Sequence, residues 1–112
     1  MREILEANFN VEVVEAGDGL EAWNMLNAGL VACVCILDVR MPKMDGLSLL
    51  AKLRGDPRFK HQKVMLCSTV NSRATILEAA RMHVDAFLLK PFNDTALLQA
   101  MRAALAAKKT ST

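Results

Sequence analysis

Short apolar runs alternate along this chain of 112 residues with longer stretches in which apolar residues recur at helical spacing. The runs are typical of buried strands, and the longer stretches are typical of amphipathic helices. Strands are therefore predicted at 11–15, 33–37, 64–67 and 86–89, and helices at 1–7, 19–28, 46–54, 72–82 and 94–107. This alternation predicts an α/β fold with a doubly wound parallel sheet and right-handed crossovers.

Turn and capping residues mark several ends of these elements. Gly29 is suited to stop the second helix, and Gly55-Asp56-Pro57 to stop the third. Either Asn93 or Asp94 can cap the last helix.

Polar residues follow three of the predicted strands. Asp38 ends the run Val34 to Leu37, Ser68-Thr69 follows the next strand, and Lys90 follows the last. Ligands bind outside the carboxyl ends of parallel strands, because those ends meet at one edge of the sheet. We therefore expect a carboxylate, a hydroxyl and an ammonium group to converge there.

The composition fits one globular domain, with 53% apolar residues and a net charge of +2. We expect a domain over 1–107 and a flexible tail over 108–112. The basic residues are scattered, so no nucleic-acid partner is predicted. No apolar run approaches the roughly 20 residues that cross a bilayer, and the start of the chain lacks a signal-peptide pattern. We therefore predict a cytoplasmic protein with no membrane partner.

The three cysteines, Cys33, Cys35 and Cys67, fall within strand-like apolar runs. An odd number of cysteines without framework spacing argues against a disulfide scaffold. No His or further Cys stands at metal-site spacing around them. All three are predicted to be buried, reduced thiols.

Four motifs, taken in their order and spacing, make residues 1–107 resemble the receiver domain of bacterial two-component response regulators, of the chemotaxis-regulator type. The motifs are Ala16-Gly17-Asp18-Gly19-x-Glu21-Ala22, Leu37-Asp38-x-x-Met41-Pro42-x-Met44-Asp45-Gly46, Ser68-Thr69 and Lys90-Pro91-Phe92. The resemblance implies a flavodoxin-like fold with strand order 2-1-3-4-5. It also implies a phosphorelay function with a histidine kinase or phosphotransfer protein as partner.

The chemistry of the residues agrees with that function. A carboxylate can act as a nucleophile and form an aspartyl-phosphate, and Asp38 is the candidate. Cations and donors must stabilise the phosphoryl oxygens during transfer, and Lys90 and Ser68 supply them. The protein would catalyse at most its own phosphorylation and dephosphorylation.

The resemblance assigns further roles residue by residue. Asp38 and the backbone carbonyl of Arg40 would bind magnesium together with an acidic pair. Ser68 and Phe87 would form the switch. The structural positions are Pro42, Asp45, Gly46 and Pro91, and the Lys90–Pro91 peptide bond would be cis.

Some of these residues also have a structural interpretation. Asp38 can be a turn residue at a strand end, and Asp45-Gly46 can simply shape a turn and cap a helix. Ser68-Thr69 can be capping residues, and Lys90 a solvated lysine at a turn. Phe87 fits the core as well as it fits a switch.

The chain departs from the family pattern at its start, because residues 1–8 match the second half of the family's first helix. The first strand and the acidic pair are then expected to be absent, which leaves four strands instead of five and weak or absent magnesium binding. The strands flanking the gap would pair directly, or another chain would supply a strand, or the sequence is a piece of a longer one.

The departure favours a second hypothesis about function. On that hypothesis the scaffold is a phosphorylation-independent interaction module. A homodimer formed by strand or domain exchange would satisfy the exposed strand edges. We favour the dimer over direct pairing, because the N-terminal helix alone covers only part of one face of the sheet.

Overall fold

The computed structural model describes residues 2–9, 16, 18–40, 43–69 and 73–106. Within these ranges five helices and three strands occur in the order α1 (Arg2–Asn8), α2 (Gly19–Asn27), β1 (Val34–Asp38), α3 (Gly46–Gly55), β2 (Lys63–Ser68), α4 (Arg73–Arg81), β3 (Ala86–Leu89) and α5 (Asp94–Ala106). The predicted elements that fall in these ranges are confirmed to within one or two residues at their ends. The predicted strand at 11–15 and the predicted tail at 108–112 lie outside the described residues.

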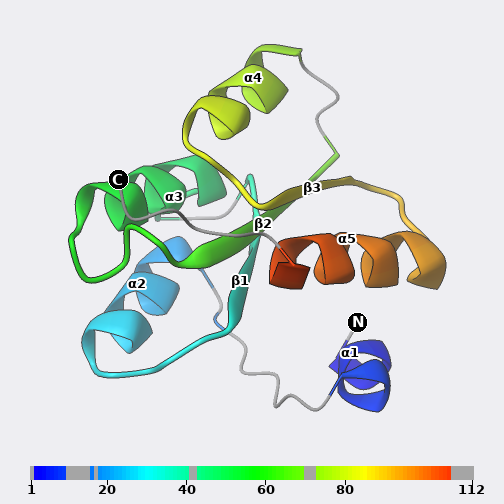
Figure 1. The fold of residues 1–112 in the computed structure, drawn as a ribbon. Coiled ribbons are helices and arrows are strands. Elements are labelled where there is room, and N and C mark those ends of the chain that lie inside the picture. The colour runs from blue at the N-terminus through cyan, green and yellow to red at the C-terminus, as the bar shows by residue number, and fades with distance from the viewer. Residues whose placement is uncertain (1, 10–15, 17, 41–42, 70–72, 107–112) are drawn as a thin grey trace.

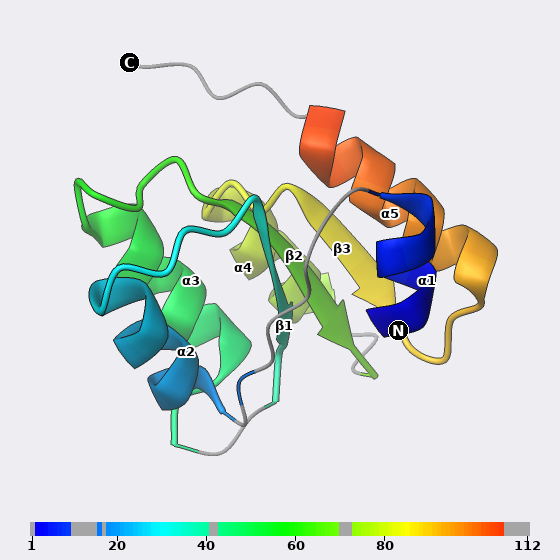
Figure 2. The same cartoon turned by 90° about the horizontal axis from the view of Figure 1, so that it is seen from below.

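The three strands form a parallel sheet in the order β1-β2-β3. Helices α1 and α5 lie on one side of the sheet, and α2 and α3 lie on the other (Figures 1 and 2). This is the doubly wound arrangement predicted from the alternation of strands and helices. None of the helices in the described part of the chain is long and apolar enough to cross a membrane.

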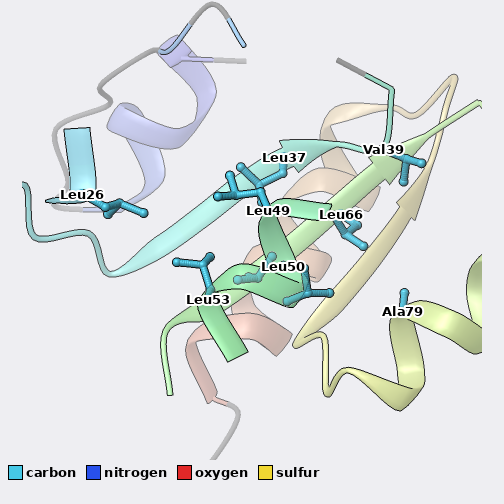
Figure 3. Close-up of a cluster of buried hydrophobic side chains, with 9 residues drawn as sticks. Leu26, Leu37, Val39, Leu49, Leu50, Leu53, Leu66 and Ala79 are labelled. Carbon is cyan, nitrogen blue, oxygen red and sulfur yellow. The ribbon is translucent and has the colours of Figure 1, made fainter. Parts of the chain in front are cut away.

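Alternating side chains of the strands build two cores. Leu37, Val64 and Leu66 pack with α2 and α3 on one face, in the cluster drawn in Figure 3. Met65 and Cys67 pack with α1 and α5 on the other face. Strand β2 contributes to both cores and is buried at every position from Val64 to Ser68, because it lies between its two neighbours.

Capping residues begin and end the helices as the sequence suggested. Asn93, and not Asp94, caps α5, because its Oδ1 accepts a hydrogen bond of 2.8 Å from the backbone N–H of Ala96. Gly29 follows the end of α2 with a φ of 110°, which a glycine adopts without strain.

The prediction that all three cysteines are buried is confirmed only for Cys67, since Cys33 is exposed and Cys35 is half-buried. Strand β1 begins one residue later, at Val34, so Cys33 belongs to the loop before the strand. Burial raises the pKa of Cys35 to about 11, against a smaller opposing effect of Arg54. Burial also raises the pKa of Cys67 to about 11. All three cysteines are free thiols, as predicted.

Candidate functional site

The carboxyl ends of the three strands meet at one edge of the sheet. Asp38 is the last residue of β1 and Ser68 the last of β2, while Lys90 directly follows β3. Backbone hydrogen bonds continue the pairing to these positions, since the N–H of Val39 donates to the carbonyl of Cys67 at 2.9 Å and that of Lys90 to the carbonyl of Ser68 at 2.7 Å. The sheet thus fixes these three residues at one edge.

Two of the predicted site residues are in direct contact. Lys90 Nζ donates a hydrogen bond to Asp38 Oδ1, and the two groups form an ion pair. The Asp38 side chain is 46% exposed and that of Lys90 is 35% exposed, so a ligand from solvent can reach both. Ser68 is only 4% exposed, which places it at the buried side of this edge.

The loop between β1 and α3 is closed tightly behind Asp38. The N–H of Gly46 donates to the carbonyl of Val39 at 3.0 Å. A Cβ atom at Gly46 would overlap the carbonyl oxygen of Asp38, so a larger residue would displace the backbone of Asp38. Asp45 Oδ1 accepts a hydrogen bond of 2.7 Å from the N–H of Ser48 and caps α3.

The remaining candidates lie around this edge. Arg40 is exposed in the loop after β1. Phe87 lies on β3 next to Leu66 of β2, half-buried and packed against the core on the α3 side. The Lys90–Pro91 peptide bond is cis. Pro42 lies outside the described residues.

A buried thiol lies close to the ion pair. Cys67 is paired in register with Asp38 and is 1% exposed. Burial raises the pKa of Cys67 most; the nearby Asp38 carboxylate raises it further, and Lys90 lowers it. The thiol is therefore neutral at physiological pH and adds no charge to the site.

The described residues alone do not form a complete magnesium site. They contain no group of three or more His, Cys, Asp or Glu residues that could hold a metal ion. Asp38 and the carbonyl of Arg40 would provide two oxygen ligands, whereas Mg²⁺ demands near-octahedral coordination and otherwise keeps several waters.

Two contacts near the site were not predicted from the sequence. Lys43 Nζ lies 3.7 Å from Asp18 Oδ2, at the start of α2. A Cβ atom at Gly19 would overlap the carbonyl oxygen of Met44. The pair Asp18-Gly19 signals a helix start in the sequence, but nothing in the pattern reveals which loop it contacts.

Comparison with known proteins identifies the class to which this fold and site belong. The family model described as response regulator receiver domain matches residues 1–102. The chain therefore belongs to the response regulator receiver domain family.

Individual relatives agree with the family. The chain is 35% identical over 94 residues to the chemotaxis protein CheY1 of Helicobacter pylori, covering 84% of this chain and 76% of that protein. It is 33% identical over 111 residues to the response regulator Rre1 of Synechocystis, covering 99% of this chain and 48% of that protein.

Solved structures share the fold. The Vibrio cholerae chemotaxis protein CheY4 has a TM-score of 0.80 at 29% identity, over 92% of this chain and 84% of that chain. The receiver domain of a signal transduction histidine kinase from Syntrophus aciditrophicus has a TM-score of 0.78 at 26% identity, over 99% of this chain and 84% of that chain.

The family settles the general function. The chain has the flavodoxin-like receiver fold and is a phosphoacceptor receiver domain of two-component signal transduction. Receiver domains generally bind Mg²⁺ and interact with histidine kinases or phosphotransfer proteins.

Proposed function

We propose that Asp38 is the phosphoacceptor and that it receives the phosphoryl group from a phosphohistidine of a kinase or phosphotransfer protein. The observation that carries this proposal is the ion pair between Lys90 Nζ and Asp38 Oδ1 at the carboxyl edge of the sheet. Two other carboxylates near this edge cap helices. Asp45 and Asp18 cap α3 and α2, accepting hydrogen bonds from the N–H groups of Ser48 and Glu21.

The chemistry follows from that geometry. One oxygen of the Asp38 carboxylate attacks phosphorus, and the bond between phosphorus and the donor's imidazole nitrogen breaks, its electron pair staying with the imidazole. Because Lys90 holds Oδ1, Oδ2 is the attacking atom. The Lys90 ammonium then stabilises the charge on the phosphoryl oxygens.

Ser68 and Phe87 complete the proposal as the switch. Ser68 ends β2 beside Lys90, and its hydroxyl is a donor for a phosphoryl oxygen on Asp38. Phe87 lies on the adjacent strand and is half-buried. A shift of the Ser68 side chain toward the phosphoryl group would change the packing around Phe87 and so report phosphorylation to the surface.

Magnesium is expected to bind weakly to this 112-residue chain. Asp38 and the Arg40 carbonyl would be its ligands, and the ion would neutralise phosphoryl charge when bound. We expect poor uptake of phosphate from acetyl phosphate with or without magnesium, measured by intact mass, and weak Mg²⁺ binding measured by isothermal titration calorimetry. Rapid phosphorylation that is strictly dependent on magnesium would contradict this expectation.

A histidine-phosphorylated donor tests the function itself. Such a donor brings its own binding surface, so incubation with a phosphorylated kinase domain is expected to modify the chain where acetyl phosphate does not. No modification by any donor, with the receiver domain of a relative as positive control, would argue against the phosphoacceptor role of this chain.

A second candidate function is a homodimer that works without phosphorylation. Its support is the burial of β1, where Val34, Cys35 and Ile36 are only half-buried, whereas the central strand β2 is buried from Val64 to Ser68. Among the strands of the described residues β1 pairs with β2 alone, and a strand edge without a partner is a template for association. A second copy that supplies a strand beside β1 would complete its burial.

We therefore expect this chain to sediment as a dimer at micromolar concentration. Analytical ultracentrifugation over a range of concentrations measures this directly. A monomer mass at all concentrations would contradict the dimer and leave phosphotransfer as the remaining function.

A cytoplasmic location forms part of the proposal. The three free thiols fit a reducing compartment, in which two-component receivers meet their kinases.

A further inference from the structure

The start of α2 contacts the loop that presents Asp38. The loop spans the residues between β1 and α3, and the start of α2 lies at the same end of the sheet as the start of α3 (Figure 2). Gly19, the first residue of α2, is buried. Its missing Cβ leaves the space in which the carbonyl of Met44 lies.

Lys43 adds a second link between the same two segments. Its φ of 67° is in the left-handed region, which is unfavourable for a residue with a side chain. Its Nζ lies 3.7 Å from Asp18 Oδ2, and Asp18 also accepts a hydrogen bond of 2.8 Å from the N–H of Glu21 as the cap of α2. The same carboxylate thus serves α2 and the loop.

The two links differ in strength. The side chain of Lys43 is 67% exposed, and exposed ion pairs contribute little. The contact of Gly19 with Met44 is between backbone atoms, which cannot move aside as a flexible side chain can. The glycine contact is therefore the main link, and the ion pair is an auxiliary one.

We infer that the N-terminus of α2 is a clamp on the loop after β1, and that Gly19 and Asp18 are positioning residues for Asp38. In this clamp, Gly19 contacts the backbone carbonyl of Met44, two residues before Gly46. Gly46 in turn lies against the carbonyl oxygen of Asp38 and donates its N–H to Val39. A displacement at Met44 is passed through this closed loop to the backbone of Asp38. The contact between α2 and the loop does not depend on the proposed role of Asp38. Only the expected effect of the clamp on phosphorylation rests on that proposed function.

The test is Gly19→Ala, with Gly55→Ala as the matched control. Gly55 also lies at a helix end, but a Cβ atom there meets nothing within 4 Å. Amide hydrogen exchange at Gly46 reports whether its bond to Val39 opens, and it needs no phosphorylation. We expect about tenfold faster exchange at Gly46 in Gly19→Ala, which corresponds to about 1.4 kcal/mol, because the added Cβ would overlap the carbonyl of Met44. The control is expected to match the parent chain.

The link to Asp38 is measured separately. With a histidine-phosphorylated donor, Gly19→Ala is expected to lower the maximal rate of transfer while the donor concentration at half-maximal rate stays the same, since docking surfaces are unchanged. Unchanged exchange at Gly46 overturns the clamp. Faster exchange with an unchanged transfer rate overturns the positioning role. If the parent chain accepts no phosphate, the role of Asp38 fails, and exchange still decides the clamp.

Asp18→Asn is the second test variant, used if Gly19→Ala does not fold. Asn caps helices about as well as Asp, so this change keeps the cap of α2 and removes the charge that faces Lys43. About twofold faster exchange at Gly46 is expected, in keeping with an exposed pair. Exchange identical to that of the parent chain would overturn the positioning role of Asp18.

Discussion

Asp38→Asn is expected to abolish phosphoryl uptake and leave the fold intact. The amide has nearly the volume of the carboxylate, but its oxygen is a poor nucleophile toward phosphorus. The variant loses the ion pair with Lys90, whose side chain is 35% exposed and gains water in exchange. The free energy of unfolding should therefore change by less than about 1 kcal/mol.

Asp45→Asn is the matched control for that experiment. Asp45 lies seven positions along the chain and caps α3 through a hydrogen bond of 2.7 Å to the N–H of Ser48. Asn is an equally good cap, so this variant should be phosphorylated like the parent chain. Intact mass after reaction with a phosphorylated kinase domain measures both. Base-labile phosphate in Asp38→Asn at the parent level would remove Asp38 from the mechanism.

The sequence was sufficient to predict the pair of Asp38 and Lys90, although 52 positions separate them. Each follows or ends a short apolar run, and parallel strands bring such positions to one edge whatever their separation. The same rule placed Ser68 at this edge. The residues at the carboxyl edge can therefore be predicted from the ends of the apolar runs once the sheet is known to be parallel.

Contacts between loops could not be predicted in the same way. Gly19 and Gly46 are recognisable as residues at helix starts, but the atoms that fill the space of their missing side chains belong to Met44 and Asp38. Such close approaches depend on the packing of whole helices. The exposure of Cys33 was also missed, because β1 begins at Val34, one residue later than predicted. A shift of one residue at a strand end moves a side chain from the sheet into the preceding loop.

Arg54 is the clearest case of a residue whose role the sequence hides. It lies in the last turn of α3, at the edge of the sheet opposite Asp38. Its guanidinium donates to the carbonyls of Gln62 at 2.7 Å, Met82 at 2.9 Å and His83 at 2.9 Å. Most of its partners are main-chain atoms, which carry no sequence signal. In a helix pattern it is simply a basic residue in the last turn.

An ion pair adds to these bonds. Arg54 Nη2 lies 3.4 Å from Asp85 Oδ2, and the same oxygen accepts a hydrogen bond of 2.7 Å from the N–H of Val64 at the start of β2. The Asp85 side chain is 3% exposed. Burial lowers the pKa of Arg54 from its usual value, with Asp85 opposing, yet a guanidinium stays charged at neutral pH. Arg54 thus joins α3, β2 and the turn that leads into β3.

Arg54→Met is expected to lower the free energy of unfolding by about 3–5 kcal/mol, because it leaves a buried carboxylate without its cation. Against a total of about 5–15 kcal/mol, that loss brings the chain close to unfolding. Urea denaturation at neutral pH measures it, with Arg58→Met as control. Arg58 pairs with Asp56 at the surface, so the same substitution there should change stability little.

Asp85→Asn in the Arg54→Met background separates the charge from the lost hydrogen bonds. Asn keeps an oxygen to accept the N–H of Val64 at the start of β2 but carries no charge. The double variant should therefore recover part of the stability that Arg54→Met loses, and the double-mutant cycle gives the interaction energy of the pair. If Arg54→Met is no less stable than Arg58→Met, Arg54 does not hold α3, β2 and β3 together, and Lys90 at the far end of β3 owes its position to the sheet alone.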